Sequence, residues 1–405
     1  MTLIDAARSL SVPDVAAARA PVTAPEFRLV QGSFGPAEPD LAAAWDRLAA
    51  GAAEPNVFAE RWFVEASTAH LPDSAGARLL QLWRGGRLIA LLPLRIDARY
   101  GRIPLRHVTN WRHHHSFLGA PLIAAGSEAE AWRALLDAID RAPWAGGILH
   151  IEGIVEGGPI HQGLQAASRA LGRPCDTVHR IERAMLASEL SPETYYERTL
   201  RKKKRKEIRR LRSRLDELGS VAARKLAAGD DPLTWAEEFL ALEASGWKGR
   251  AGSALACRND TAAFFRAAIA GAHAAARLEM LRLDLDGRAI AMLVNFLAPP
   301  GSFSFKIAFD EDYARFSPGV LIQLENLAIL GRRDIAWMDS CAVENHPMIN
   351  SLWAERRPIV RVTLPIAGTA NAIRFHACRT IERIAAQRRK RRNTAQPAEI
   401  EDDDG

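Results

Sequence analysis

The sequence is poor in cysteine, in lysine and in long apolar runs, and each shortage excludes a class of protein. Its four cysteines are scattered and form no C-x-x-C pair, so they fit neither a disulfide framework nor a zinc knuckle and suit a reducing cytoplasm. The longest uninterrupted apolar stretch is about seven residues, Leu88 to Leu94, far short of the roughly 20 that span a bilayer. The first 25 residues lack the apolar block of a secretory signal. We therefore predict a soluble, cytoplasmic protein.

Common motifs for cofactors, metals and nucleophiles are also missing. No P-loop, no G-x-G-x-x-G after a strand and no G-x-S-x-G nucleophile elbow occurs. The run His113-His114-His115 has no cysteine or acid at ligand spacing, and adjacent histidines on a strand point to opposite faces. We therefore expect no bound metal.

The positive charge of the chain is concentrated in one segment. The formal net charge is +6, but residues 198–214 alone carry eleven Lys or Arg and one Glu, which leaves the rest of the chain at −4. Ile208, Leu211, Leu215 and Leu218 recur at three- and four-residue steps and predict a helix with one apolar stripe and a broad basic face. This helix either attracts phosphate, anionic lipid or a polyanionic partner, or is a solvated linker whose stripe packs on a neighbouring domain.

The chain contains an internal repeat. Residues 80–92 and 281–293 are identical at seven of thirteen positions, where chance gives about one. Each copy reads as a β-hairpin with a glycine turn, followed by a helix and an apolar strand that ends in an acid, Glu152 or Asp339. With 405 residues, this pattern predicts an α/β protein of two tandem domains joined by the basic helix. The expected divisions are a disordered N-terminus (1–26), a first domain (27–195), the linker helix (196–222), a second domain (223–378) and a disordered charged tail (379–405).

The second copy carries more candidate chemistry. In the strand SFSFKIAFD, alternation predicts one apolar face with Phe303, Phe305, Ile307 and Phe309, and an opposite face with Ser304, Lys306, Ala308 and Asp310. Next comes a helix start at which Ser317 fits the N-cap and Pro318 the first turn, beside Gly319 and Val320. Free amides at such a start can cradle a diphosphate.

Further polar residues are expected at the same edge of the sheet. Asp339 ends a strand, and Asn345 follows it, while a Gly-punctuated turn upstream holds Glu243, Trp247 and Lys248. Arginine outnumbers lysine 46 to 8, so Lys248 and Lys306 are candidates for positions that need an amine whose pKa can shift. Polar groups from three elements at one edge predict a pocket.

These motifs resemble a known family. The segments LEASGWKGRAGSAL, FSFKIAFDEDYARFSPGVLIQLENL and DIAWMDSCAVENHPMINSLW are similar to the CelD/BcsL-type branch of the GNAT acyltransferases, linked to cellulose and other exopolysaccharide biosynthesis. The resemblance covers roughly residues 27–365, and the tandem layout also resembles the FemABX peptidyltransferases. It implies a GNAT-like fold in each half, with acetyl-CoA or another acyl-CoA between two splayed strands of the second half.

The resemblance also implies roles for individual residues. Of the usual pyrophosphate loop only Gly319 is present, and Tyr313 or water would replace the tyrosine that protonates the leaving thiolate. The implied cofactor-binding residues are Phe305, Ser317, Pro318, Gly319, Val320 and Asn345. The implied catalytic residues are Asp339 and Glu243, in that order as the base, and Tyr313. The implied substrate-binding residues are Trp247, Lys248, Lys306 and Asp310.

Three functions follow as alternatives. The first is an acyl-CoA-dependent N- or O-acyltransferase of polysaccharide or cell-envelope metabolism, acting on an amine- or hydroxyl-bearing sugar or peptide. The second is a FemABX-like transferase that uses aminoacyl-tRNA, for which the basic helix supplies an attractive surface. The third is a non-catalytic accessory protein that docks on a polysaccharide synthase through this helix. In each case the first copy is expected to have lost cofactor binding and to serve as scaffold or acceptor site.

Overall fold

The computed structural model describes residues 27–33, 35–74 and 76–395. The strands are β1 (Phe27–Ser33), β2 (Arg78–Arg84), β3 (Arg87–Asp97), β4 (His107–Asn110), β5 (Leu122–Ile123), β6 (Ile148–Val155), β7 (Asp176–Leu186), β8 (Val221–Lys225), β9 (Leu278–Leu285), β10 (Arg288–Ala298), β11 (Gly301–Phe309), β12 (Trp337–Asp339) and β13 (Glu355–Pro365). The α-helices are α1 (Pro39–Ala50), α2 (Arg61–His70), α3 (Glu128–Arg141), α4 (Pro159–Ala170), α5 (Pro192–Thr199), α6 (Lys202–Asp216), α7 (Pro232–Ser245), α8 (Trp247–Arg250), α9 (Asn259–Ala274), α10 (Pro318–Glu325), α11 (Pro347–Asn350) and α12 (Thr369–Ala395). Short 3₁₀ turns are η1 (Val57–Ala59), η2 (Pro72–Ser74), η3 (Leu255–Cys257), η4 (Glu311–Phe316) and η5 (Asn326–Gly331).

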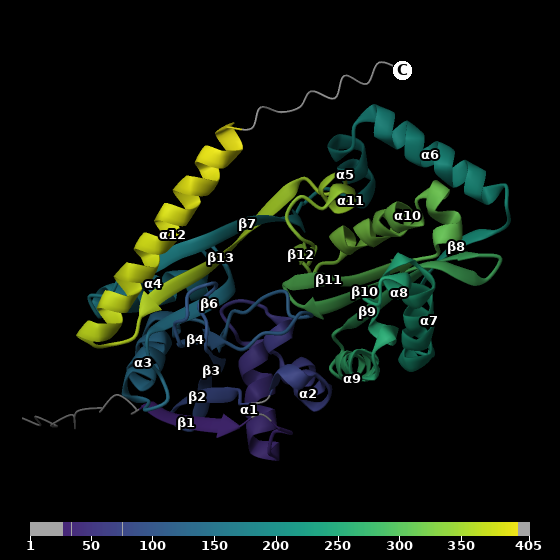
Figure 1. The fold of residues 1–405 in the computed structure, drawn as a ribbon. Helices are drawn as coiled ribbons and strands as arrows, with labels where there is room; N and C mark the ends of the chain where they lie inside the picture. Colours follow the sequence, from purple (N-terminus) through teal and green to yellow (C-terminus); the bar gives the residue numbers. More distant parts are fainter. Residues whose placement is uncertain (1–26, 34, 75, 396–405) are drawn as a thin grey trace, which may run out of the picture.

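Within the described ranges, thirteen strands form one continuous mixed sheet (Figure 1). Its order is β1-β2-β3-β4-β6-β13-β7-β12-β11-β10-β9-β8, and β5 pairs with β3. The predicted α/β class is therefore confirmed. In the half that holds β8 to β12, α7 and α9 lie on one side of the strands, and α5, α6 and α10 lie on the other (Figure 1).

The two halves repeat one topology and exchange their last strands. In each half, three antiparallel pairings are followed by one parallel pairing, β4 with β6 and β11 with β12. The next strand of the first half in the chain, β7, pairs with β12 of the second half, and β13 pairs with β6 of the first. Because β7 and β13 also pair with each other, the halves share a continuous hydrogen-bonded sheet.

The repeated sequence segments form the β2–β3 and β9–β10 hairpins, as predicted. The central turn glycines, Gly86 and Gly287, both have positive φ, 79° and 81°. Each hairpin shifts register at the same aligned position, which leaves Ile89 in one and Ile290 in the other as the extra residue of a β-bulge. A bulge shared at equivalent positions is independent support for duplication.

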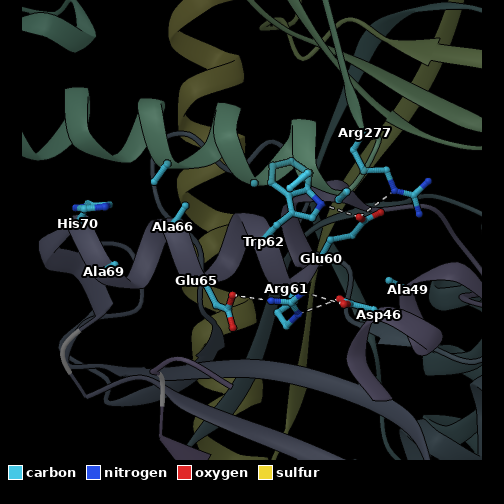
Figure 2. A pocket seen from close by; sticks show the side chains of 14 residues that line it. Asp46, Ala49, Glu60, Arg61, Trp62, Glu65, Ala66, Ala69, His70 and Arg277 are labelled. Carbon is cyan, nitrogen blue, oxygen red and sulfur yellow. Dashed lines mark hydrogen bonds and ion pairs between the residues drawn. The ribbon is translucent and has the colours of Figure 1, made fainter. Parts of the chain in front are cut away.

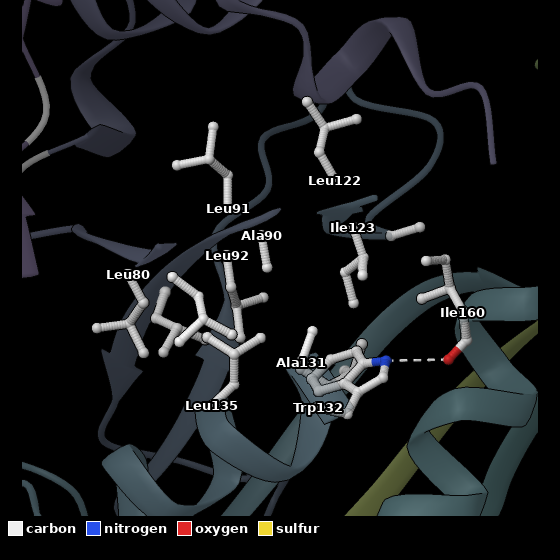
Figure 3. Packing of buried hydrophobic residues seen from close by; sticks show 14 of the residues in the cluster. Leu80, Ala90, Leu91, Leu92, Leu122, Ile123, Ala131, Trp132, Leu135 and Ile160 are labelled. Atoms are coloured by element: carbon white, nitrogen blue, oxygen red, sulfur yellow. Dashed lines mark hydrogen bonds between the residues drawn. The ribbon is translucent and has the colours of Figure 1, made fainter. Parts of the chain in front are cut away.

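Apolar side chains cover both faces of the sheet. In the first half, Leu80 and Leu92 of the hairpin pack with Trp132 of α3, whose indole N–H donates to the carbonyl oxygen of Ile160 at 3.0 Å (Figure 3). A second core joins the two halves, since Phe63 of α2 contacts the rings of Phe264 and Phe305. Each fully buried side chain of this size contributes roughly 1.5–3 kcal/mol, so the joint aromatic core holds the halves together.

The two charged helices differ in part from the predictions. In α6, Ile208 and Leu215 are buried as expected, but Leu218 is 47% exposed because the helix ends at Asp216. The tail expected to be disordered from residue 379 continues α12 as far as Ala395. Phe375 and Cys378 anchor this helix in a small core, and Arg379 binds Asp176 at 3.0 Å.

The expected disorder of residues 1–26 and 396–405 lies outside the described residues. None of the helices in the described ranges is both long enough and apolar enough to cross a bilayer.

Candidate active site

The sheet opens between β11 and β12. These parallel strands pair only over Gly301–Phe303 and Trp337–Asp339. Beyond that point β11 continues, but the amide of Ser340 donates to Ala184 of β7 at 3.1 Å and Cys341 takes a left-handed conformation with φ 53°. The chain after β12 therefore turns away from β11.

A pocket of about 160 Å³ lies at this opening, and we call it the splay pocket. Backbone or side-chain atoms of four consecutive β11 residues line it, together with groups from α8, α10 and the segment after β12. These lining residues are Ser304, Phe305, Lys306, Ile307, Lys248, Gln323, Ser340, Cys341, Ala342, His346, Met348 and Ile349. The two parallel strands are thus separated where a ligand can enter between them.

A β-bulge in β11 sets which side chains face this pocket. Opposite β10, the register passes from Ser304 to Lys306, so Phe305 is the extra residue. A bulge brings two consecutive side chains to one face, which ends the predicted alternation. Phe303 and Phe305 pack in the core shared with α2 and α9, whereas Ile307 and Phe309 pack on the opposite side against the α10 core. The prediction that these four residues share a face is therefore wrong.

Lys306 is one of the polar side chains that line the splay pocket. It is half-buried, and within the described part of the chain its Nζ has no hydrogen-bond or ion-pair partner. Burial lowers the pKa of Lys306 to about 8, although the charge of Glu243 acts in the opposite direction. The Nζ lies 5.3 Å from the centre of the Phe305 ring. This amine can change protonation state near neutral pH.

Glu243 lies beside Lys306, but both of its carboxylate oxygens already accept hydrogen bonds from other groups. Its buried carboxylate accepts from Lys248 Nζ at 2.8 Å through one oxygen and from the amide of Leu255 at 2.8 Å through the other. Lys248 also lines the splay pocket, so the structure brings Glu243, Lys248 and Lys306 together. Trp247, 55% exposed, lines a smaller adjoining cavity of about 30 Å³ and presents its ring to solvent.

The structure places Asp339 in a different environment from the one expected for a general base. Its carboxylate is 0% exposed and binds Arg183 of β7 at 3.2 Å and Arg357 of β13 at 3.1 Å. Burial acts to raise its pKa, but these two guanidinium groups hold the pKa of Asp339 below its ordinary value. The geometry thus argues for an ion-paired carboxylate that joins three strands rather than for a base.

Two further predicted residues lie away from the splay pocket. Asp310 caps η4 by accepting from the amide of Asp312 at 3.1 Å, and it also binds Arg288 at 2.8 Å. Tyr313 is half-buried against the apolar core beneath α10 and lines none of the described pockets. Neither side chain is therefore positioned to contact a ligand between β11 and β12.

The start of α10 offers fewer free amides than predicted. Ser317 occupies the N-cap position in a left-handed conformation, φ 54°, and its side chain makes no capping hydrogen bond. Pro318 has no N–H, and the Val320 amide already donates to Ser317 at 2.9 Å. Gly319 lets the helix pack closely, because a Cβ there would lie 3.4 Å from both Met348 Sδ and Phe309 Cδ1. These contacts favour packing of α10 on β11 over binding of a diphosphate.

Residues after β12 were only partly anticipated. Asn345 is exposed in a turn with φ 58°, and its neighbour His346 lines the splay pocket instead. Cys341 lines it too, and burial raises the pKa of its thiol well above the ordinary value. Neither residue was predicted to be part of the site, because their approach to β11 depends on the turn that follows Asp339.

A larger cavity lies elsewhere, in a groove of about 580 Å³ between α2 and α9 (Figure 2). Its charged groups already pair with one another. Arg61 binds Asp46 at 2.8 Å and Glu65 at 2.9 Å, and Arg277 binds Glu60 at 3.3 Å (Figure 2). This groove is larger than the splay pocket, but each Asp, Glu and Arg among its described lining residues already has an ion-pair partner.

Comparisons with known proteins agree with the architecture. Residues 202–346 match the family model described as acetyltransferase (GNAT) domain. Among solved structures, FemX aligns with 80% of this chain and 95% of its own at 11% identity and a TM-score of 0.55. L-PGS from Bacillus licheniformis aligns with 82% of this chain and 92% of its own at 11% identity and a TM-score of 0.50. No curated protein sequence matches the chain significantly.

This part of the chain is therefore similar to a GNAT acetyltransferase domain, which supports the predicted acyltransferase activity. The matched residues include α6, the strands β8 to β12 and the splay pocket as far as His346. The assignment to the CelD/BcsL-type branch stays a prediction.

Proposed function

We propose that the protein is an acyl-CoA-dependent N- or O-acyltransferase whose chemistry takes place in the splay pocket. The observation that carries this proposal is Lys306, an unpaired lysine beside a bulge, where two parallel strands separate. It stands within the residues that match the GNAT domain. Glu243 and Lys248 complete the polar side chains around it.

The residues of the splay pocket suit the thioester arm of acyl-CoA better than its diphosphate. The splay pocket has a volume of only about 160 Å³, and apolar side chains make up half of its lining (Phe305, Ile307, Cys341, Ala342, Met348 and Ile349), as suits a thin arm that ends in a thioester. Phe305 has no partner residue on β10, so its amide is our candidate for holding the carbonyl oxygen of the acyl group. The start of α10 supplies little for the diphosphate, as described above. When bound, acyl-CoA supplies an activated acyl group.

Lys306 would act as the general base. As the acceptor's nitrogen or oxygen bonds to the acyl carbon, the neutral Lys306 amine accepts the acceptor's proton. The resulting ammonium can return that proton to the sulfur when the carbon–sulfur bond breaks, so protons balance over the reaction. A base whose pKa lies near the operating pH serves best, and the pKa of Lys306 is about 8. Glu243 would position Lys248 and steady the local charge.

The test combines a ligand assay with a pH profile. Acetyl-CoA at millimolar concentration should raise the melting temperature, and kcat/KM should rise with pH to a plateau above about 8, because the deprotonated amine is the active form. Lys306→Met should lower kcat by about 10²- to 10⁴-fold, the usual contribution of a general base, and should keep the acetyl-CoA shift. Lys225→Met serves as the matched control, because Lys225 is an exposed lysine on β8 that does not line the splay pocket.

Two results would contradict the proposal. One is the absence of any melting shift with acetyl-CoA. The other is a Lys306→Met variant with unchanged activity and an unchanged pH profile.

A second candidate donor is aminoacyl-tRNA. The basic face of α6 favours it, since Lys202, Lys203 and Lys206 are exposed beside the matched domain. Salt-sensitive binding of tRNA that disappears when these lysines are neutralised would support this alternative. The role in cellulose, exopolysaccharide or cell-envelope biosynthesis, and the acetyl group as the acyl chain, rest on the sequence resemblance alone.

A further inference from the structure

A second pocket lies where the two halves meet, and we call it the histidine pocket. Its volume is about 330 Å³, within the range of roughly 300–1,000 Å³ typical of small-molecule sites. One wall comes from the loop with His113, His114 and His115 of the first half. The other comes from residues 252–261 of the second half, which connect α8 to α9.

Two imidazole nitrogens of histidines that line this pocket have no hydrogen-bond partner among the residues that the structure describes. His113 is 6% exposed, and its Nδ1 accepts the amide hydrogen of His115 at 3.2 Å, so in the neutral ring the proton lies on Nε2. That Nε2 is buried and makes no hydrogen bond within the described residues, and the same holds for Nδ1 of His115. Buried polar atoms are nearly always paired in folded proteins, so two orphans at one pocket indicate a ligand that supplies the missing partners.

Aromatic neighbours from both halves fix the orientation of these rings. His113 stacks on Phe63 of α2 with ring centres 5.6 Å apart, and His115 stacks on Phe264 of α9 at 5.4 Å. Stacked rings on helices cannot turn freely, so the unpaired nitrogens are held in place before any ligand binds. The pocket is complete only when both halves are present.

The histidine pocket is joined to the splay pocket through Glu243 and Lys306. Glu243 accepts the amide hydrogen of Leu255, which lines the histidine pocket, and its other oxygen holds Lys248 of the splay pocket. A chain of aromatic contacts also connects the two sites, since the ring of Phe63 lies 5.6 Å from that of His113 and 6.2 Å from that of Phe305, over which Lys306 Nζ lies at 5.3 Å. A molecule in the histidine pocket would thus lie near the proposed base.

The chemistry of the lining selects the kind of ligand. Burial lowers the pKa of His113 and of His115 to about 3, so both rings are neutral at physiological pH. Arg258 and Asp260, which also line the pocket, form an ion pair, so their charges cancel. A hydroxyl group can accept from the His113 N–H and can donate to or accept from His115, whichever tautomer it adopts. Neutral polyhydroxyl molecules therefore suit this pocket better than anions or ammonium ions.

We infer that the histidine pocket binds the acceptor of the acyl transfer, and that this acceptor is a carbohydrate that presents hydroxyl groups to His113 and His115. The inference rests on the proposed function and assigns the first half a part in the substrate site. The hydroxyl group of the bound sugar that attacks the acyl carbon would face Lys306. The loop with Leu255, which Glu243 holds by a hydrogen bond, would lie between them.

The experiment uses the full-length protein with cellobiose, glucose and N-acetylglucosamine, which are all neutral, as probes. Binding is followed by isothermal titration calorimetry, and the histidine nitrogens by ¹⁵N NMR. At least one sugar should bind and should shift the resonances of His113 Nε2 and His115 Nδ1. His113→Phe and His115→Phe keep ring stacking but remove the nitrogens, so each should weaken sugar binding at least tenfold. His179→Phe, on the exposed face of β7, is the matched control.

The outcomes separate this inference from the proposed function. The melting shift with acetyl-CoA should be unchanged in His113→Phe and His115→Phe, which also shows that the variants are folded. Sugar binding that neither variant weakens would overturn the assignment of the pocket. An acetyl-CoA shift without binding of any sugar would overturn the carbohydrate acceptor and leave the acyltransferase intact. The absence of any acetyl-CoA shift would overturn the proposed function itself.

Discussion

Asp339→Asn is the substitution that best separates a structural from a catalytic carboxylate. Asparagine has the shape of aspartate, and its amide oxygen can still accept the hydrogen bond that the Cys341 amide donates to Asp339 at 2.8 Å in the wild type. What it loses is the negative charge between Arg183 and Arg357, which are cross-strand neighbours in the β7–β13 ladder. The variant would leave two buried guanidinium groups facing each other without a counter-charge.

The magnitude follows from the burial of this cluster. Removing one partner of a buried ion pair typically destabilises a protein by about 3–5 kcal/mol, and Asp339 is the partner of two arginines. We expect the free energy of unfolding in urea, followed by tryptophan fluorescence, to fall by about that amount. Asp334→Asn removes a surface pair with Arg332 at 2.6 Å and should cost only about 0–1 kcal/mol.

The pH dependence has a definite sign. Because the pKa of Asp339 is lowered in the folded protein, its stabilisation is present above the unfolded pKa of about 3.9 and is lost as the pH falls through the folded value. The difference in stability between wild type and Asp339→Asn should therefore be constant near neutral pH and shrink in acid. An Asp339→Asn protein of unchanged stability that is inactive and has lost one limb of its pH profile would refute this reasoning and restore Asp339 as the base.

Two other predictions concern the opening of the sheet and the basic helix. Gly301→Ala places a Cβ 2.2 Å from the ring of Trp337, so the pairing of β11 and β12 must shift, and we expect the free energy of unfolding in urea to fall by about 1–3 kcal/mol. The control is Gly331→Ala, whose Cβ would have no atom within 4 Å and should change the stability little. Equal effects of the two substitutions would contradict this account. Replacing Lys202, Lys203 and Lys206 by Gln should change the free energy of unfolding by less than about 0.5 kcal/mol, because all three side chains are exposed. If acyl-CoA is the donor, kcat/KM for acetyl-CoA should also stay unchanged. A rise in KM for acetyl-CoA would instead place α6 at the donor site.

Local features of this protein could be predicted from its sequence. The repeated hairpins, the helix that begins at Pro318 and the amphipathic core of α6 all depend on residues a few positions apart. Turn glycines, a helix-initiating proline and apolar spacing act through such short-range contacts, and duplication leaves a direct trace in the sequence. The α/β class and the duplicated halves were accessible in this way, whereas the GNAT-like fold and the site roles of Glu243, Lys248 and Lys306 came from the family resemblance.

Partners far apart in the chain were decided only by the tertiary structure. The exchange of β7 and β13 brings Arg183 and Arg357 to Asp339, 156 and 18 residues away, and so turns an expected base into a buried ion pair. The bulge at Phe305 reverses the faces of β11, because one extra residue shifts every later side chain. Sequence alone determined which elements form. The pairing of strands across the two halves determined which charged groups have an ion-pair partner, as Asp339 does, and which have none within the described ranges, as is the case for Lys306.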